Sequence, residues 1–294
     1  MPEIDFTPYL NNPSIYGTNT LLYGLPGSGK TDSLASYIAA GLKLRVLFTE
    51  RGGHESVLKA IRRKNLPIEK FDWAYVSPAT QSIANLLDLA DQVKYKSYKD
   101  ISESKIGLNR GDFHQYLEFL RTMTDFKSAR TGESFGPVES WDIDVAFAVD
   151  GLSGVNMMAR DHTVGGKLTM HEGEWGVAME QEKKLLHTLI AGTRCHICVI
   201  AHMQRIFSDA AQQVEAMPDM LGKKLAPSIS RIFNDILIAK RNGIQFSWTN
   251  IEPEAPTKFT ILPPGDNLTP SFEPMIQEWA KLVESGKFSA PTSV

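Results

Sequence analysis

Residues 21–31 constrain the fold of this chain more than any other stretch, because a short apolar run there leads into a glycine-rich turn and then into a helix-forming segment. The pattern G-x-x-x-x-G-K-[ST] is filled by Gly24, Gly29, Lys30 and Thr31. Glycines let the backbone turn sharply enough for successive N–H groups to face phosphate oxygens. The start of the following helix adds partial positive charge. We therefore interpret the stretch as a nucleotide-binding P-loop.

The P-loop interpretation assigns roles to side chains. Lys30 would reach the β- and γ-phosphates of ATP, and the Thr31 hydroxyl would bind Mg²⁺. The predicted nucleotide contacts are Gly24, Leu25, Pro26, Gly27, Ser28, Gly29, Lys30, Thr31 and Asp32. The alternative is a glycine-rich surface turn. It is disfavoured because the strand before the turn and the helix after it both stand where the motif needs them.

Composition bounds the remaining possibilities. A chain of 294 residues with 42% apolar content can build one large α/β domain or two small ones. A net charge of −3 gives no overall attraction to nucleic acid. Neither a basic-then-apolar leader nor a long apolar span is visible, so we expect a cytoplasmic protein. Cys195 and Cys198 form half a zinc site at most and lie in an apolar run, so we expect packed, reduced thiols.

Two later strands end in carboxylates. The apolar run 44–49 is followed by Glu50, and the run 145–149 ends in Asp150. An apolar strand ending in one aspartate is typical of a Walker B strand, whose carboxylate holds Mg²⁺, so we predict a metal site made by Thr31 and Asp150. The alternative is that Asp150 only ends its strand before the turn at Gly151.

The pattern along the rest of the chain predicts alternating strands and helices. Residues 1–20 read as an extended lead-in, and 81–93 as an amphipathic helix. Residues 154–173 and 208–222 read as flexible loops. Two apolar runs around Asn242-Gly243 predict a β-hairpin. A strand at 258–262 and a helix at 271–285 complete the prediction.

The position of the carboxylates resembles that of the RecA-like ATPases. Asp150 is followed by Gly151 and not by a glutamate, and Glu50 instead ends the strand after the P-loop helix. In RecA-like ATPases the water-activating glutamate lies there, so the resemblance implies that role for Glu50. It also implies a sensor residue at the end of the 197–201 strand, which would be His202 or, second, Gln204.

The same resemblance implies a fold and a division of the chain. The fold is a RecA-like P-loop NTPase core, α/β, with a mostly parallel sheet flanked by helices and a C-terminal antiparallel hairpin. The core would span 21–262, after the lead-in 1–20 and before a C-terminal helix and tail at 263–294. Residues 222–227 and 233–235 are similar to the phage-encoded nucleotide-binding proteins of the AAA_24 type, associated with recombination and single-strand annealing. A phage-encoded protein would act in the host cytoplasm.

Two basic residues precede the predicted hairpin turn. Lys240 and Arg241 resemble the basic finger of hexameric RecA-like helicases, which implies a homo-oligomer with catalytic sites at subunit interfaces. Phosphoryl transfer gathers negative charge that such a cation stabilises. The alternative is that both side chains are simply solvated.

Two functions remain in competition. The first is an ATPase acting on single-stranded DNA in recombination, replication or repair. Its DNA contacts would come from the two predicted loops, the first with Arg160, His162, Lys167 and His171 and with Trp175 after it, the second containing three acidic residues. Solvated loops without a nucleic-acid role are the alternative. The second function is a viral DNA-packaging or virion-assembly ATPase subunit without a nuclease domain.

Overall fold

The computed structural model describes residues 4–103, 110–208, 213–222 and 225–287. Several residues used above lie outside these ranges: Asp209 of the second predicted loop, Lys223 and Lys224 of the motif at 222–227, and the tail from 288 onward. Within the described residues, no helix combines the length and the apolar character that a bilayer crossing requires.

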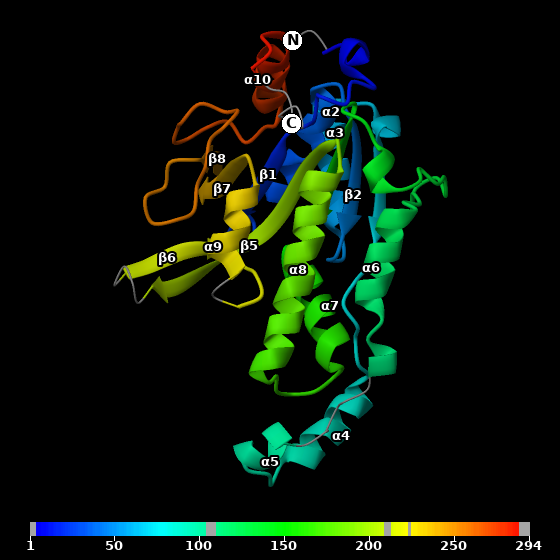
Figure 1. Cartoon of the computed structure of the whole chain (residues 1–294), viewed down its shortest axis with the longest axis vertical. Coiled ribbons are helices and arrows are strands. Elements are labelled where there is room, and N and C mark those ends of the chain that lie inside the picture. The colour runs from blue at the N-terminus through cyan, green and yellow to red at the C-terminus, as the bar shows by residue number, and fades with distance from the viewer. Residues whose placement is uncertain (1–3, 104–109, 209–212, 223–224, 288–294) are drawn as a thin grey trace.

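One mixed sheet organises the chain (Figure 1). Its strands are β1 (Asn19–Gly24), β2 (Lys43–Phe48), β3 (Phe71–Tyr75), β4 (Val145–Asp150), β5 (His196–Ser208), β6 (Gln213–Pro218), β7 (Asp235–Asn242) and β8 (Gln245–Thr249). They are ordered β3-β2-β4-β5-β1-β7-β8, with β6 paired to β5 off this path. Only β5–β6 and β7–β8 are antiparallel among these pairs. The predicted α/β class, with a mostly parallel sheet flanked by helices and an antiparallel hairpin toward the C-terminus, is confirmed.

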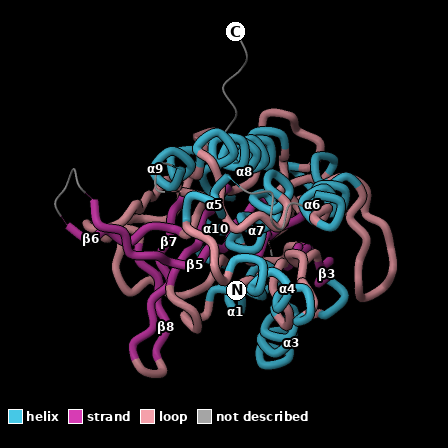
Figure 2. Tube along the Cα trace, turned by 90° about the horizontal axis from the view of Figure 1, so that it is seen from below, coloured by secondary structure: helices cyan, strands magenta, loops and turns pink. Residues whose placement is uncertain are grey.

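Helices cover both faces of the sheet (Figure 2). They are α1 (Lys30–Ser33), α2 (Ala35–Ala39), α3 (Gly53–Lys64), α4 (Ile83–Val93), α5 (Tyr98–Glu103), α6 (Gln115–Thr124), α7 (Leu152–Val164), α8 (Glu172–Gly192), α9 (Leu225–Ile229) and α10 (Glu273–Glu284). Helices α6, α7 and α8 pack on one face, and α2, α3 and α10 pack on the other. Because both faces are covered, β1 and β4 are buried along their whole length, and β4 is apolar up to its final residue, Asp150.

The lead-in to β1 packs on the C-terminal helix. Phe6 lies 6.2 Å and Tyr9 5.8 Å from Trp279, measured between ring centroids. The Tyr9 hydroxyl also donates to Glu284. Residues that precede the sheet therefore lie against residues that follow it. The two cysteines are buried and unpaired, as the sequence predicted, and burial raises the pKa of Cys195 to about 12.

The prediction of a loop at 154–173 is wrong for most of that segment. Helix α7 occupies 152–164, and α8 begins at Glu172. Gly154 lies inside α7 and is needed for close packing, since a β-carbon there would lie 2.4 Å from Thr49 Oγ1. Residues around most of α7 are buried, so it lacks the amphipathic period that marks a surface helix.

Two further predictions are wrong. Residues 208–222 include a strand, because β5 continues to Ser208 and β6 returns antiparallel to it, with Phe207 opposite Val214. Residues 258–262 form no strand and pair with β7 only through the bridge between Ile236 and Lys258. The backbone N–H groups of residues 260, 261 and 262 instead donate to the buried Asp235 carboxylate.

Glu182 of α8 is a buried carboxyl group beneath the segment that follows β6. Its Oε2 accepts from the Leu221 N–H at 3.1 Å, and its Oε1 has no partner among the described residues. Burial raises the pKa of Glu182 from 4.5 to about 8, and the Leu221 bond opposes this rise. Folding therefore keeps Glu182 protonated at pH values where the unfolded chain ionises.

We expect Glu182→Gln to stabilise the protein in a pH-dependent way. Below pH 4 both states of the wild type are protonated, so the two proteins should unfold alike. As pH rises from 4.5 to 8 the wild type loses stability, because only its unfolded state releases the proton. At pH 8 the variant should be more stable by roughly 3–5 kcal/mol, which urea unfolding at pH 4, 6 and 8 would measure. Glu180→Gln, an exposed change on the same helix, is the control. A gain that does not depend on pH would contradict the assignment.

Candidate active site

The carboxyl ends of the parallel strands meet beside the P-loop. Gly24 of β1 is in register with His202 of β5, and Phe48 of β2 is in register with Asp150 of β4. Strand β5 lies between β1 and β4. This edge is where α/β sheets place ligands. The sheet therefore brings residues 24, 48, 150 and 202, which are far apart in the sequence, to one edge.

The P-loop curls around the amine of Lys30. Lys30 Nζ donates to Gly24 O at 2.8 Å and to Leu25 O at 3.0 Å. Burial lowers the pKa of Lys30, while Asp150 and Glu50 oppose that shift. Gly29 has φ +83°, in the left-handed region, so the loop requires glycine immediately before α1. These contacts hold a cation inside the loop.

The donors around the loop fit a nucleotide and its metal. The hydroxyl of Ser28 is buried and has no partner among the described residues, as a phosphate-binding group would be before binding. Burial raises the pKa of Asp150 to about 6, and a hydrogen bond with the Thr31 side chain opposes this rise. No group of three or more possible protein ligands for a metal occurs within the described part of the chain. One carboxylate beside one hydroxyl suits Mg²⁺, which takes most of its ligands from phosphates and water.

Glu50 and His202 contact each other across the sheet edge. His202 Nε2 lies 3.1 Å from Glu50 Oε1. This hydrogen bond lowers the pKa of Glu50 and raises the pKa of His202. Gln204, the second candidate for the sensor, lies farther along β5, and its side chain donates to Pro218 O at 3.4 Å. The structure therefore brings His202, and not Gln204, to Glu50.

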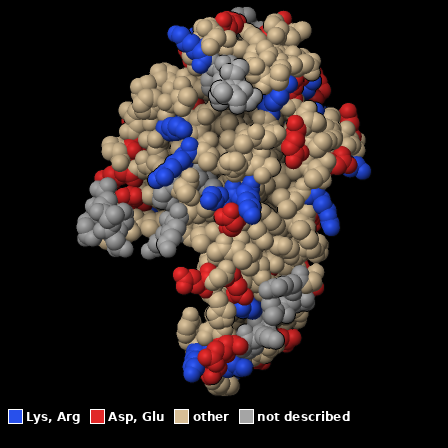
Figure 3. Space-filling model, viewed as in Figure 1, with Lys and Arg blue, Asp and Glu red and all other residues tan. Residues whose placement is uncertain are grey.

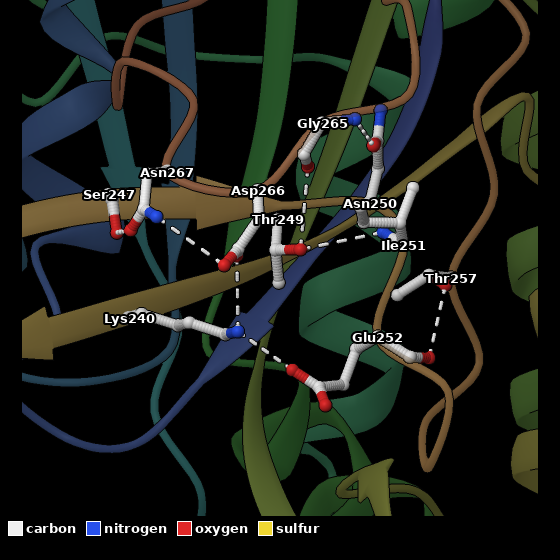
Figure 4. Close-up of polar contacts among 10 residues, drawn as sticks. All are labelled: Lys240, Ser247, Thr249, Asn250, Ile251, Glu252, Thr257, Gly265, Asp266 and Asn267. Carbon is white, nitrogen blue, oxygen red and sulfur yellow. Dashed lines mark hydrogen bonds and ion pairs between the residues drawn. The ribbon is translucent and has the colours of Figure 1, made fainter.

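The β7–β8 hairpin separates its two basic residues. Figure 4 shows the Lys240 amine between two carboxylates of its own chain, 2.7 Å from Glu252 Oε2 and 3.3 Å from Asp266 Oδ1. Arg241 instead lies against its own P-loop, since a β-carbon built on Gly27 would be 3.5 Å from Arg241 Nη1. Arg241 Nε donates to Gly243 O. The structure therefore pairs Lys240 with two carboxylates and places Arg241 against the P-loop.

A cavity of about 840 Å³ joins the P-loop to the carboxylates and the histidine at the strand ends. Its lining includes the P-loop from Pro26 to Asp32, together with Glu50, Asp150 and His202. Sequence analysis missed other residues of its wall, such as Phe246 of β8, Arg63 of α3 and Ser271 before α10. Arg63 pairs with Asp32 at 2.7 Å. No local motif marks these residues, because only the packing of β8, α3 and α10 beside the loop brings them in.

The cations proposed for DNA contact are mostly engaged. Arg160 pairs with Asp161 at 2.8 Å. Lys167 pairs with Glu174 at 2.8 Å, and its side chain is only 9% exposed. On the face in Figure 3, the described Lys and Arg residues are scattered, some of them beside Asp or Glu, and they form no continuous basic track. Helix α7 and its flanking turn thus present few free positive charges.

Comparisons with known proteins found similarity to solved structures alone. No protein-family model matches the chain, and no curated protein matches it. Among solved structures, the RadB recombinase is similar with a TM-score of 0.37 and 12% identity, over 80% of this chain and 81% of that chain. The flagellar accessory protein FlaH from Methanocaldococcus jannaschii is similar with a TM-score of 0.30 and 9% identity, over 84% of this chain and 83% of that chain.

Proposed function

We propose that the chain is a Mg²⁺-dependent ATPase of the RecA-like type. The observation that carries the proposal is the contact between Glu50 and His202 in the cavity that also contains Lys30 and Asp150. A P-loop alone binds phosphate, but hydrolysis also needs a group that orients and deprotonates water. Glu50 is a carboxylate of lowered pKa beside the loop, so it can accept that proton.

Each residue of the site has a role in this mechanism. Lys30 exchanges its two carbonyl partners for phosphate oxygens when the nucleotide binds. Glu50 orients the attacking water and accepts its proton, while His202 holds the Glu50 carboxylate in place through Nε2. Thr31 and Asp150 would hold Mg²⁺, which when bound neutralises charge on the β- and γ-phosphates.

We assign the finger role to Arg241 alone, acting on the P-loop of its own subunit. Its guanidinium lies beside Gly27, whereas Lys240 is held by Glu252 and Asp266. A cation at this point can stabilise charge that develops on the γ-phosphate. This assignment replaces a finger delivered from a neighbouring subunit, so the sites need not lie at subunit interfaces.

We further propose that the ATPase acts on single-stranded DNA, in recombination of the phage type. The supporting observation is the β5–β6 hairpin, which projects from the sheet in Figure 1. Phe207 on this hairpin is 51% exposed, and Arg205 is two residues before it on the same strand face. An aromatic ring and a cation on one face suit stacking of unpaired bases and contact with their phosphates.

One set of assays tests both levels of the proposal. Phosphate release from ATP should require Mg²⁺ and stop when EDTA is added. Single-stranded DNA should raise the rate more than duplex DNA does, and Phe207→Ala should remove that stimulation without changing the basal rate. Absence of any ATP hydrolysis, with and without DNA, would contradict the ATPase. Stimulation by duplex DNA alone would contradict the single-strand proposal and favour a packaging-type motor.

A further inference from the structure

Helix α4 carries an apolar face that no described residue of its own chain covers. No residue of this helix is buried. Ile83, Leu86 and Leu87 are 81%, 46% and 64% exposed, and with Ala90 they follow the spacing i, i+3, i+4, i+7 of one helix face. An isolated helix of this length is marginal in water, and exposed apolar faces of this kind mark interaction sites. The helix therefore lacks the partner that its sequence pattern requires.

The same chain has an apolar groove between α6 and α8. Its volume is about 450 Å³, and its walls include Leu117, Leu120, Met123, Leu185 and Leu189. Leu117 is 38% exposed, so the groove opens to the surface. The α6 wall runs from Tyr116 to Thr124, about 13 Å at 1.5 Å per residue, and α4 is about 16 Å long by the same measure. The groove can therefore accept most of a helix of that length.

We propose that α4 of one copy of this chain docks, apolar face inward, in the α6–α8 groove of a second copy. This is recognition of an amphipathic helix by an apolar groove, with anchors at i, i+3, i+4 and i+7. The occupant is a second copy because both halves of the contact belong to the same chain.

Charge supports the pairing and sets its direction. The charged residues of α4 are Asp88 at its centre and Asp91 in its second half. Lys184, on the groove wall, makes no ion pair within the described residues, and Glu139 lines the groove at η4, the short turn Val138–Ser140. The acidic half of α4 would lie toward Lys184, and the uncharged half toward Glu139.

The position of α4 makes a contact within one chain unfavourable. In Figure 1, α4 and α5 extend beyond the lower ends of α7 and α8 as an arm, and Figure 3 shows the same arm as a separate lobe. The groove runs alongside α6 and α8 as far as Val138 and Thr193. The contact joins two different surfaces, so it is heterologous and each copy can bind one neighbour at its arm and another at its groove.

Two exposed substitutions test the contact. Leu87→Glu places a charge on the apolar face of α4, and Leu117→Glu places a charge on the wall of the groove. Each should prevent docking by its own surface, and neither position is in the protein core. Sedimentation velocity without nucleotide should show that the wild type assembles as its concentration rises, and that each variant stays a monomer of 32.7 kDa. An equimolar mixture of the variants should form dimers and nothing larger, because only one intact arm and one intact groove can meet. Gln92→Glu, on the opposite face of α4, adds the same charge and should assemble like the wild type.

A crosslink identifies the surfaces directly. Leu87→Cys and Leu117→Cys, mixed and oxidised, should form a disulfide between the two variants, since Cys195 and Cys198 are buried and do not compete. A monomeric wild type, variants that assemble normally, or a mixture without dimers would each overturn the proposal. These measurements do not involve ATP. The assembly proposal can therefore fail while the ATPase proposal stands, and the ATPase proposal can fail while the assembly proposal stands.

Discussion

Glu50→Gln should bind ATP as the wild type does and hydrolyse it at least about 100-fold more slowly. The amide keeps the size of the side chain but cannot accept the proton of the attacking water. In the proposed site the P-loop, and not Glu50, binds the phosphates, so the affinity should change little. A fluorescent ATP analogue would measure binding, and phosphate release would measure turnover. Normal hydrolysis by this variant would remove the main support for the RecA-like mechanism.

The same substitution has a second readout at His202. The hydrogen bond with Glu50 is the largest cause of the raised pKa of His202. In Glu50→Gln the pKa of His202 should therefore fall toward its ordinary value, which NMR titration of the imidazole would show. Glu55→Gln, an exposed change near the start of α3, is the matched control and should alter neither turnover nor that pKa. An unchanged His202 pKa would mean that the contact does not form in solution.

The sequence predicted the edge of the sheet better than its surroundings. Gly24, Glu50 and Asp150 each end a short apolar run, and parallel strands bring such ends to one edge. That argument needs only the local pattern and the alternation of strands and helices. It could not choose between His202 and Gln204, because the end of the parallel part of β5 depends on its pairing with β1 and not on local sequence.

The errors arose where tertiary contacts override the local pattern. Gly165-Gly166 suggested a loop over 154–173, but Gly165 only ends α7. The residues of α7 are buried around most of the helix, so its sequence lacks the alternation of polar and apolar residues that marks a surface helix. The stretch 208–222 looked like a loop because it is polar, yet residues 213–218 form β6 and pair with the end of β5. Phe246 was invisible as a site residue since only the packing of the β7–β8 hairpin places its ring against Gly29.

The apolar face of α4 shows a different limit of prediction from sequence. The periodic pattern of α4 was recognised in the sequence, but a pattern says only that one face needs an apolar neighbour. It does not say whether that neighbour is the chain's own core. The structure shows an uncovered face, and this makes assembly a property to be tested apart from catalysis.

Lys30→Ala should abolish both ATP binding and ATP hydrolysis. The amine lies inside the curl of the P-loop, held by Gly24 O and Leu25 O, and it is the buried cation closest to where the phosphates bind. Removing the amine should cost several kcal/mol of electrostatic stabilisation of the phosphates, because Asp150 and Glu50 add further negative charge to the site.

Lys240→Ala is the matched control, since it removes the same charge from a side chain that the structure holds between Glu252 and Asp266. Isothermal titration with ATP and Mg²⁺ should show no heat of binding for Lys30→Ala and near-normal affinity for Lys240→Ala. Thermal melting without ATP should give both variants the melting temperature of the wild type, which excludes a folding defect. Added ATP should raise the melting temperature of Lys240→Ala by mass action and leave that of Lys30→Ala unchanged. Equal loss of binding in both variants would place Lys240 in the nucleotide site, and wild-type affinity in Lys30→Ala would rule out the P-loop as that site.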